Sequence, residues 1–270
     1  MSRPTLPLKP EHSPQAGAWG WWVQSWRVVH LGALLLVLIL SPSTYQGEVR
    51  RLMAQHIYRS TAPILGWFTV LFALFSLVLT RIVVATAESY GLSQYALQVV
   101  IRVLVLELIP LTAALFVALR CTLPDSADLL ELQRTGGWAA LARQGRDPVR
   151  MAVLPRVVAG IFATITLAAI SGVVALVLAY LAEFGFTLAG IASYTRVFGQ
   201  VFSPPVVLIF VLKTGFFSLA VSLMPMASAL YTLSTRASRQ IRSLAELRSL
   251  VRMFTVLLLI EVASLVGNYY

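Results

Sequence analysis

The chain has 270 residues, a formal net charge of +10 at pH 7, 58% hydrophobic residues and only 12% charged residues. So many apolar side chains exceed what one soluble core can bury, which excludes a soluble globular protein and predicts an all-α integral membrane protein. The basic residues are spread among apolar segments rather than gathered into one soluble patch, so we expect no nucleic-acid partner.

The N-terminal part of the chain divides into a tail and an apolar region. Residues 1–18 contain four prolines and predict a disordered cytoplasmic tail. Residues 19–62 follow as an interfacial or elbow region. Within it, tryptophans precede only ten uninterrupted apolar residues, 31–40, and about 20 are needed to cross the hydrocarbon core as a helix. We therefore expect 19–40 to form a helix that lies in the membrane interface rather than crosses it.

Five later segments reach or approach the length of a transmembrane helix. They lie at about 63–87, 97–120, 151–182, 206–233 and 253–270. The last is the shortest and carries Glu261, but it ends in two tyrosines, which favour the membrane interface. The sequence thus predicts one five-span domain over residues 63–270.

Arginines crowd two of the connections between these segments and avoid the others. One group is Arg120, Arg134, Arg143, Arg146, Arg150 and Arg156, and the other is Arg236, Arg239, Arg242, Arg248 and Arg252. The alternate connections hold no arginine or only Arg196. By the positive-inside rule the crowded connections are cytoplasmic, so we expect a cytoplasmic N-terminus and a C-terminus on the outer side.

The sequence carries no catalytic or metal-binding motif. A phosphate-binding P-loop needs a lysine in a glycine-rich frame, and neither Lys9 nor Lys213 has one. The three histidines do not form a Glu-x-x-His pair, and the single cysteine, Cys121, excludes an internal disulfide. We expect no catalytic residue, metal or cofactor, so that any ATP hydrolysis takes place in another chain.

Charged residues within or near the spans are the candidate functional groups, because an ionised side chain in lipid is costly unless it is paired or wetted. They are Arg81, Arg102, Glu107, Lys213 and Glu261. Arg102 and Glu107 share one helix, and Pro110 weakens that helix one turn later. The alternative is that these charges only snorkel toward headgroups or pair for assembly.

Short motifs in and after the second span resemble the MlaE (YrbE) family of ABC transporter permeases, the membrane subunits of bacterial MCE lipid transport systems. The family carries Arg-Glu-Leu-Gly-Pro where this chain has Leu106-Glu107-Leu108-Ile109-Pro110, so the glutamate and the proline match. Arg102, one helical turn before the missing arginine, points from the same face of an α-helix and can replace it.

The resemblance continues through the third and fourth spans. The family's Asp-Pro, Pro-Arg and Ala-Gly pairs match Asp147-Pro148, Pro155-Arg156 and Ala159-Gly160, and Lys213 matches a family lysine. With this resemblance we expect a lipid path formed by Arg102, Glu107, Pro110, Lys213 and Glu261.

The connection 121–150 departs from the family. There the family has a cytoplasmic coupling helix that fits a groove on the ATPase, with a Glu-Gln pair at its centre where this chain has Gly136-Gly137. Two glycines cost about 1 kcal/mol each and predict a break in the helix, whose expected N-cap is Asp125. The candidate coupling residues are Asp128, Leu129, Leu132, Trp138, Asp147 and Pro148. The alternative is an interfacial helix that meets only lipid.

The resemblance implies a homodimeric permease subunit in a bacterial inner membrane, with its C-terminus in the periplasm. It would move phospholipid or a related hydrophobic molecule between that membrane and a periplasmic MCE protein, powered by a separate ABC ATPase. Two alternatives remain open. One is a degenerate, non-transporting membrane scaffold for such a complex, and the other is a proton-coupled secondary transporter, although no internal repeat supports the latter.

Overall fold

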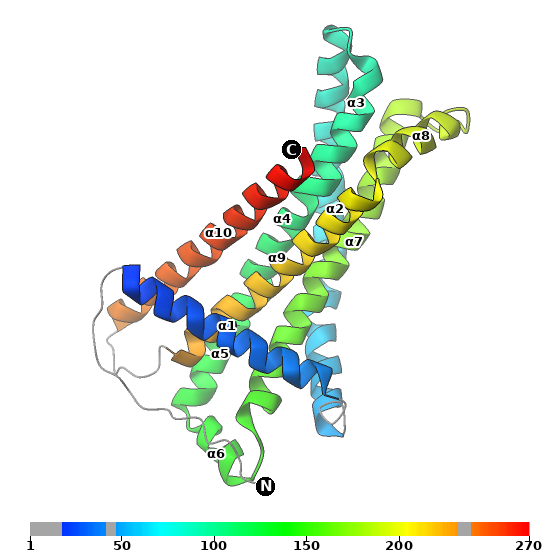
Figure 1. Cartoon of the computed structure of the whole chain (residues 1–270). Helices are drawn as coiled ribbons and strands as arrows, with labels where there is room; N and C mark the ends of the chain where they lie inside the picture. The colour runs from blue at the N-terminus through cyan, green and yellow to red at the C-terminus, as the bar shows by residue number, and fades with distance from the viewer. Residues whose placement is uncertain (1–17, 42–46, 232–238, 270) are drawn as a thin grey trace.

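The computed structural model describes residues 18–41, 47–231 and 239–269, which form helices and turns with no strand among them (Figure 1). Five helices in these residues are long and apolar enough to cross a membrane. They run over Glu48–Ser89, Tyr95–Arg134, Val149–Phe184, Pro204–Tyr231 and Leu247–Asn268. The prediction of an all-α membrane protein with five spans is confirmed. Apart from Ala18, the predicted tail lies outside the described residues.

The second span is a continuous helix of changing pitch. It consists of α3 (Ser93–Val100), η2 (Ile101–Leu108), α4 (Ile109–Val117), η3 (Ala118–Thr122) and α5 (Leu123–Arg134). Both η2 and η3 are π-helical, a wider turn that is rare and frequently found at functional sites. Pro110 stands in the first turn of α4, directly after η2, where its missing N–H and its ring disturb the preceding turn.

The third span packs along the first. It begins with η4 (Val149–Val153), continues as α7 (Leu154–Phe184) and lies against α2 (Glu48–Ser89). Small residues allow close approach on α7, where Ser171, Ala175 and Ala179 are buried at every fourth position. On another side of α7, a Cβ atom at Gly160 would lie 2.6 Å from the hydroxyl oxygen of Ser222, which belongs to the fourth span (Pro204–Tyr231), so glycine allows α7 to approach that span closely.

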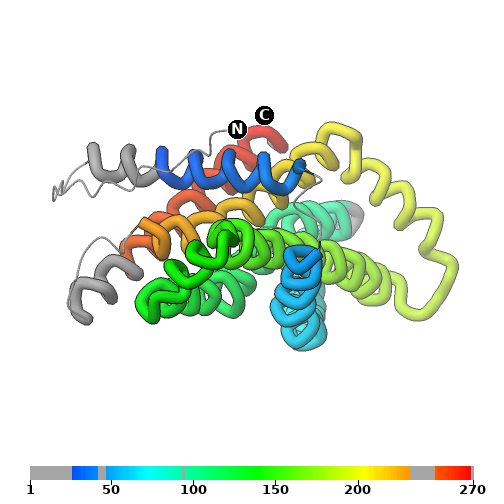
Figure 2. Tube along the Cα trace, turned by 90° about the horizontal axis from the view of Figure 1, so that it is seen from below, coloured from blue at the N-terminus to red at the C-terminus, as the bar shows by residue number. Residues whose placement is uncertain are grey.

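The N-terminal helix α1 (Ala18–Leu40) lies across the other helices. Seen from below, α2 points along the line of sight, whereas α1 runs in the plane of the picture (Figure 2). Leu31 and Leu35 are buried against a cluster that includes Met53 and Met226, while Val37 and Leu40 are exposed. Its apolar part, Trp26–Leu40, is shorter than a transmembrane helix. This geometry suits the interfacial position expected from the sequence.

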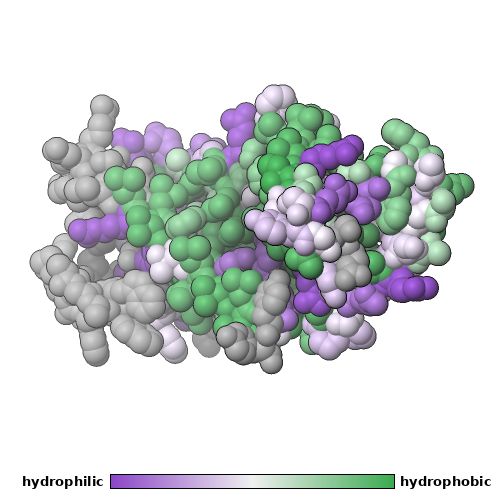
Figure 3. All heavy atoms as spheres, turned by 90° about the horizontal axis from the view of Figure 1, so that it is seen from above, coloured by the Kyte–Doolittle hydropathy of each residue, from purple (hydrophilic) through white to green (hydrophobic). Residues whose placement is uncertain are grey.

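At the opposite end of the bundle, α7 turns into the short helix α8 (Ile191–Val201), which leads to α9 (Pro204–Tyr231). Tyr194 holds α8 in place, since its hydroxyl donates a hydrogen bond of 2.8 Å to the Leu176 carbonyl. Burial raises the pKa of Tyr194 to about 12, which keeps that hydroxyl protonated. The turn before α8 exposes Phe186 and Leu188. Seen from above, the molecule shows large hydrophobic areas on its surface (Figure 3).

The connection between the second and third spans contains the predicted break. Helix α5 ends at Arg134, Gly136 adopts a left-handed conformation with φ of 78°, and α6 (Gly137–Arg143) follows. The prediction that Asp125 caps a new helix is wrong, because the helix of the span continues through η3 into α5 and Asp125 lies within its first turn.

The last helix, α10 (Arg239–Tyr269), begins well before the predicted span at 253. Arg252 was expected among the cytoplasmic arginines, but it is buried against the bundle with 7% of its surface exposed. Its neighbour on the previous turn, Arg248, is exposed. The arginine-rich region therefore continues into the packed part of α10.

Candidate functional site

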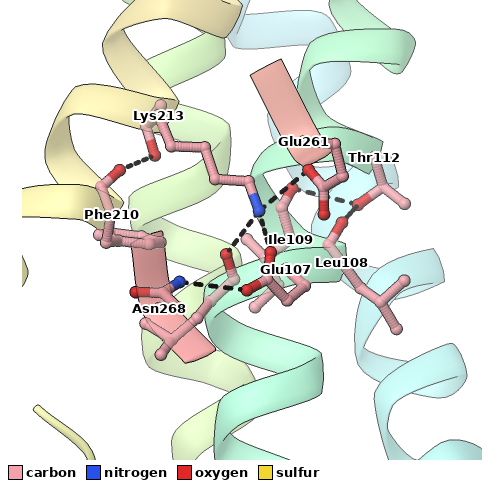
Figure 4. A network of polar contacts seen from close by, with 10 residues as sticks. Glu107, Leu108, Ile109, Thr112, Phe210, Lys213, Glu261 and Asn268 are labelled. Atoms are coloured by element: carbon pink, nitrogen blue, oxygen red, sulfur yellow. Dashed lines mark hydrogen bonds and ion pairs between the residues drawn. The ribbon is translucent and has the colours of Figure 1, made fainter. Parts of the chain in front are cut away.

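Polar side chains from three helices meet inside the bundle (Figure 4). Glu107 comes from η2, Lys213 from α9, and Glu261 and Asn268 from α10. Lys213 is 2% exposed and Glu107 is 7% exposed, although both carry charge. We call these four residues the polar cluster.

Lys213 is the centre of the polar cluster. Its ammonium forms ion pairs with the carboxylates of Glu107 and Glu261, the latter at 2.9 Å. The Asn268 side-chain amide donates a hydrogen bond of 3.3 Å to the second carboxylate oxygen of Glu107. The ammonium also lies 5.8 Å from the centre of the Phe217 ring, a favourable position for a cation. Each buried charge thus has a partner of opposite sign.

Pro110 explains one further contact of the lysine. In η2 the N–H of Ile109 bonds to the carbonyl of Leu104, five residues earlier, and Pro110 has no N–H with which to continue this series. The Leu106 carbonyl instead accepts a hydrogen bond of 3.2 Å from the Lys213 ammonium. Pro110 therefore frees a backbone acceptor at the point where α9 brings its lysine to the second span.

The charges of the polar cluster do not cancel. If all three groups are ionised, the single ammonium of Lys213 faces the two carboxylates of Glu107 and Glu261, which leaves one negative charge in excess. An uncompensated buried charge is costly. The polar cluster can therefore gain stability from a cationic group brought by a ligand.

An apolar cavity adjoins the polar cluster. It has a volume of about 450 Å³ and lies between α9 and α10, and its lining includes Lys213. Apolar lining residues are Ile209, Leu212 and Phe216 of α9 and Val256, Leu259 and Ile260 of α10. A mostly apolar cavity of this size with only two polar residues on its wall, here Lys213 and Ser264, is typical of sites for small hydrophobic ligands.

Arg102 stands apart from the polar cluster, although the sequence suggested that it accompanies Glu107. Its Nε atom is buried without a hydrogen-bond partner, and within the described residues no ion pair joins it to Glu107. The structure thus brings together Glu107, Lys213 and Glu261 of the predicted set, with Pro110 acting beside them through the Leu106 carbonyl. The sequence analysis did not predict Asn268. The only indication in the sequence is that a polar residue stands near the end of the last span.

The apolar coupling candidates face the chain's own core. Leu129 is completely buried, and Leu132 and Trp138 are half-buried in the same cluster, together with Leu31 and Leu35 of α1. Leu129 packs inside this cluster of the chain's own core, and its predicted role in coupling stays a prediction. Asp128 is exposed on α5.

Asp147 and Pro148 start the third span. The Asp147 carboxylate accepts a hydrogen bond of 2.9 Å from the Val149 N–H, and Pro148 follows in the turn position where a proline costs no hydrogen bond. The adjacent Arg146 forms a 3.1 Å ion pair with Glu48 at the start of α2. These contacts give the Asp-Pro pair a structural role at the arginine-rich connection.

Comparison with known proteins places this arrangement in a family. The family described as Permease MlaE matches residues 53–266, which cover most or all of each of the five spans and all members of the polar cluster but Asn268. No curated protein matches the chain. Within the described residues, no group of three or more His, Cys, Asp or Glu side chains could hold a metal ion.

Proposed function

The chain belongs to the MlaE permease family of bacterial inner-membrane transporter subunits, and on this premise we propose which molecules it moves and with which partners. It is an ABC-type permease for lipid transport and not an enzyme by itself. We propose that it moves phospholipid or a related hydrophobic molecule between the inner membrane and a periplasmic MCE protein. A separate ABC ATPase supplies the energy, and two copies of the chain form a homodimer.

The polar cluster beside an apolar cavity is the observation that carries this proposal. Lys213 belongs to both, because it pairs with Glu107 and Glu261 and also lines the cavity. A lipid has the same two parts, a polar headgroup and an apolar chain. We propose that headgroups interact with the polar cluster during transport while the chains remain in apolar surroundings, and that Arg102 and Pro110 support this path from the same span.

The broken connection favours one alternative, a scaffold that does not transport. Gly136 separates α5 from α6, and Leu129 is turned inward, so the surface offered to an ATPase differs from a continuous helix. If the coupling is retained, it depends on Asp128, on the half-buried Leu132 and Trp138, and on the way Asp147 and Pro148 join α6 to the third span.

The proposed orientation places the connection 121–150 in the cytoplasm and α8 in the periplasm. In a Cys121→Ser background, a cysteine at the exposed Ser193 of α8 should react with an impermeant thiol reagent added to spheroplasts. A cysteine at the exposed Gln144 should react only after permeabilisation. Equal labelling of both positions from outside would contradict the orientation.

Purification from the native host followed by reconstitution tests the function. We expect an ABC ATPase to co-purify, and ATP to drive the transfer of fluorescent phospholipid between liposomes that hold the complex and a periplasmic MCE acceptor. Omission of ATP provides the control. If no ATPase co-purifies, the scaffold becomes the better account. If the ATPase is present and no lipid moves under any condition, the proposed substrate is wrong.

A further inference from the structure

A hydroxyl group without a partner lies on the wall of the apolar cavity between α9 and α10. It belongs to Ser264, which lines the cavity together with Lys213 and is 6% exposed. The Oγ atom of Ser264 is buried and has no hydrogen-bond partner. Such a group is costly, because it has lost its hydrogen bonds to water without replacing them. Ser264 therefore provides a donor and an acceptor that a bound molecule can use.

The hydroxyl of Ser264 differs from other hydroxyls of the last two spans. Serine and threonine in helices can donate a hydrogen bond to a backbone carbonyl three or four residues earlier. Thr214, Ser218 and Thr255 do so, at 2.8, 2.8 and 2.9 Å. The hydroxyl of Ser222 also lacks a partner, but Ser222 does not line this cavity. Ser264 thus combines a position on the cavity wall with a hydroxyl that its own helix does not satisfy.

The position of Ser264 on α10 directs it toward the interior of the bundle. It lies three residues after Glu261 and four residues before Asn268, and residues at these spacings share one face of an α-helix. Glu261 and Asn268 both reach the polar cluster from that face. Ser264 therefore stands where the cavity adjoins the polar cluster.

Lys213, the other polar residue on the cavity wall, has no hydrogen-bond donor left for a ligand. An ammonium has three donors. That of Lys213 pairs with Glu107 and Glu261, and its third partner is the Leu106 carbonyl. Since two carboxylates face one ammonium, the polar cluster would repel an anionic group, and this repulsion is strong away from water. The cavity therefore favours a ligand without negative charge.

The size and the opening of the cavity restrict the ligand further. Its volume of about 450 Å³ lies in the range for drug-sized molecules, roughly 300 to 1,000 Å³. The lining residues Leu212, Phe216 and Leu259 are exposed, so the cavity opens onto the apolar outer surface of the bundle. A ligand would enter from the hydrocarbon part of the membrane. An alkane would match the apolar walls but would leave the Ser264 hydroxyl without a partner.

We propose that the cavity between α9 and α10 binds an uncharged hydrophobic molecule with one hydrogen-bonding group, such as an alcohol, a ketone or an ester, and that this group bonds to the Ser264 hydroxyl. The ligand differs from a phospholipid, whose phosphate carries negative charge. The site does not depend on the proposed function, because binding requires neither a partner protein nor transport.

Photolabelling of the purified full-length protein in phospholipid nanodiscs tests the proposal. The probe is octanol with a photoreactive diazirine on its chain, and mass spectrometry identifies the labelled residues. We expect labels on residues that line the cavity, such as Ile209 and Ile260. Unlabelled octanol should compete with the probe. Octane, which has no hydrogen-bonding group, and octanoate, which is anionic, should compete roughly twofold to tenfold less well at equal concentration in the membrane.

Substitution of the serine tests the hydrogen bond. Ser264→Ala should lower the affinity for the probe roughly twofold to tenfold, the range for loss of one hydrogen bond. The variant should be at least as stable as the wild type in thermal unfolding, because the hydroxyl has no partner in the free protein. The matched control is Ser249→Ala, which removes another buried serine hydroxyl of α10 outside the cavity and should leave the affinity unchanged.

A second variant tests the cavity without changing the hydroxyl. Ala263 lines the cavity and is exposed, so the fold should tolerate a larger side chain there. Ala263→Phe should fill part of the cavity and reduce labelling of its walls while Ser264 is intact.

Three results would overturn the proposal. They are labels spread evenly over the lipid-facing helices, equal competition by octane and octanol, and unchanged affinity in both Ser264→Ala and Ala263→Phe. ATP-driven lipid transfer is measured separately. Its failure would refute the proposed function and leave the site intact, because the labelling uses neither ATP nor a partner.

Discussion

The polar cluster and the connection 121–150 both contain charged residues, but they differ in how those charges are held. In the polar cluster, Lys213 and Glu107 are almost completely buried and paired across two helices. In the connection, the ion pair between Arg134 and Glu131 is formed within one helix, and more than half of each side chain is exposed. The first arrangement is maintained by tertiary packing, whereas the second is local and open to water.

This difference determines what each region contributes to stability. Breaking a buried ion pair leaves an unpaired charge and commonly lowers the free energy of unfolding by roughly 3 to 5 kcal/mol. An exposed ion pair contributes only about 0 to 1 kcal/mol. The connection depends instead on its apolar contacts and on the turn at Gly136. The effects of substitutions in the two regions should therefore differ in magnitude and in the property that they change.

The largest effect is expected from Lys213→Met. This change removes the only cation of the polar cluster and leaves Glu107 and Glu261 facing each other, so it should lower the free energy of unfolding by roughly 3 to 5 kcal/mol. The control is the triple variant Lys213→Met, Glu107→Gln, Glu261→Gln, which removes every charge and should recover most of the loss. Reversible unfolding in mixed detergent micelles measures both. A triple variant as unstable as the single one would show that packing, and not charge, holds this region.

A smaller effect, on partner binding, is expected from Trp138→Ala. Trp138 is half-buried at the connection, and truncation of an aromatic anchor commonly costs about 2 kcal/mol or more, roughly thirtyfold in affinity. The variant should lose the ATPase on co-purification. Arg143→Ala, in the same helix and exposed, should retain it. Full retention by Trp138→Ala would mean that the docking contacts lie elsewhere.

The smallest effect should come from Gly136→Ala. Gly136 has φ of 78°, a left-handed conformation that costs a residue with a Cβ about 1 to 2 kcal/mol. No atom lies within 4 Å of the added Cβ, so backbone strain is the only expected cost. Thermal unfolding and ATPase co-purification would both be measured. A stability equal to that of the wild type would show that the turn relaxes, and the break between α5 and α6 would then be less well defined than the structure indicates.

The helical class and the five spans could be predicted from the sequence, because apolar length is a local property of the chain. The break at Gly136-Gly137 could also be predicted, because the low helix propensity of glycine is a local property too. The capping role of Asp125 was predicted wrongly, since a local N-cap pattern gives no information on whether the preceding helix continues through it. Local patterns are reliable here only where no neighbouring element competes with them.

The partner of Glu107 could not be predicted from the sequence. Arg102 was expected to replace the missing arginine at position 106, one turn later on the same face, on the assumption of α-helical periodicity, but it lies in the π-helical η2, where the period differs. The actual partner, Lys213, is 106 residues away on another helix. Pro110 was recognised as a helix breaker, yet its effect on the Leu106 carbonyl depends on where α9 packs. The burial of Leu129 likewise appears only in the tertiary structure, where the residue packs inside a cluster of the chain's own core.

The most direct test of the central claim, that the polar cluster serves the lipid path, is ATP-dependent lipid transfer by a reconstituted Glu107→Gln complex. Glutamine keeps the size of the side chain and an oxygen for the Asn268 amide, and it leaves Lys213 paired with Glu261. The account predicts that transfer is abolished while the yield of purified protein and the melting temperature stay near those of the wild type. Transfer at the wild-type rate, or loss of transfer together with loss of the fold, would contradict it and leave the polar cluster a purely structural role.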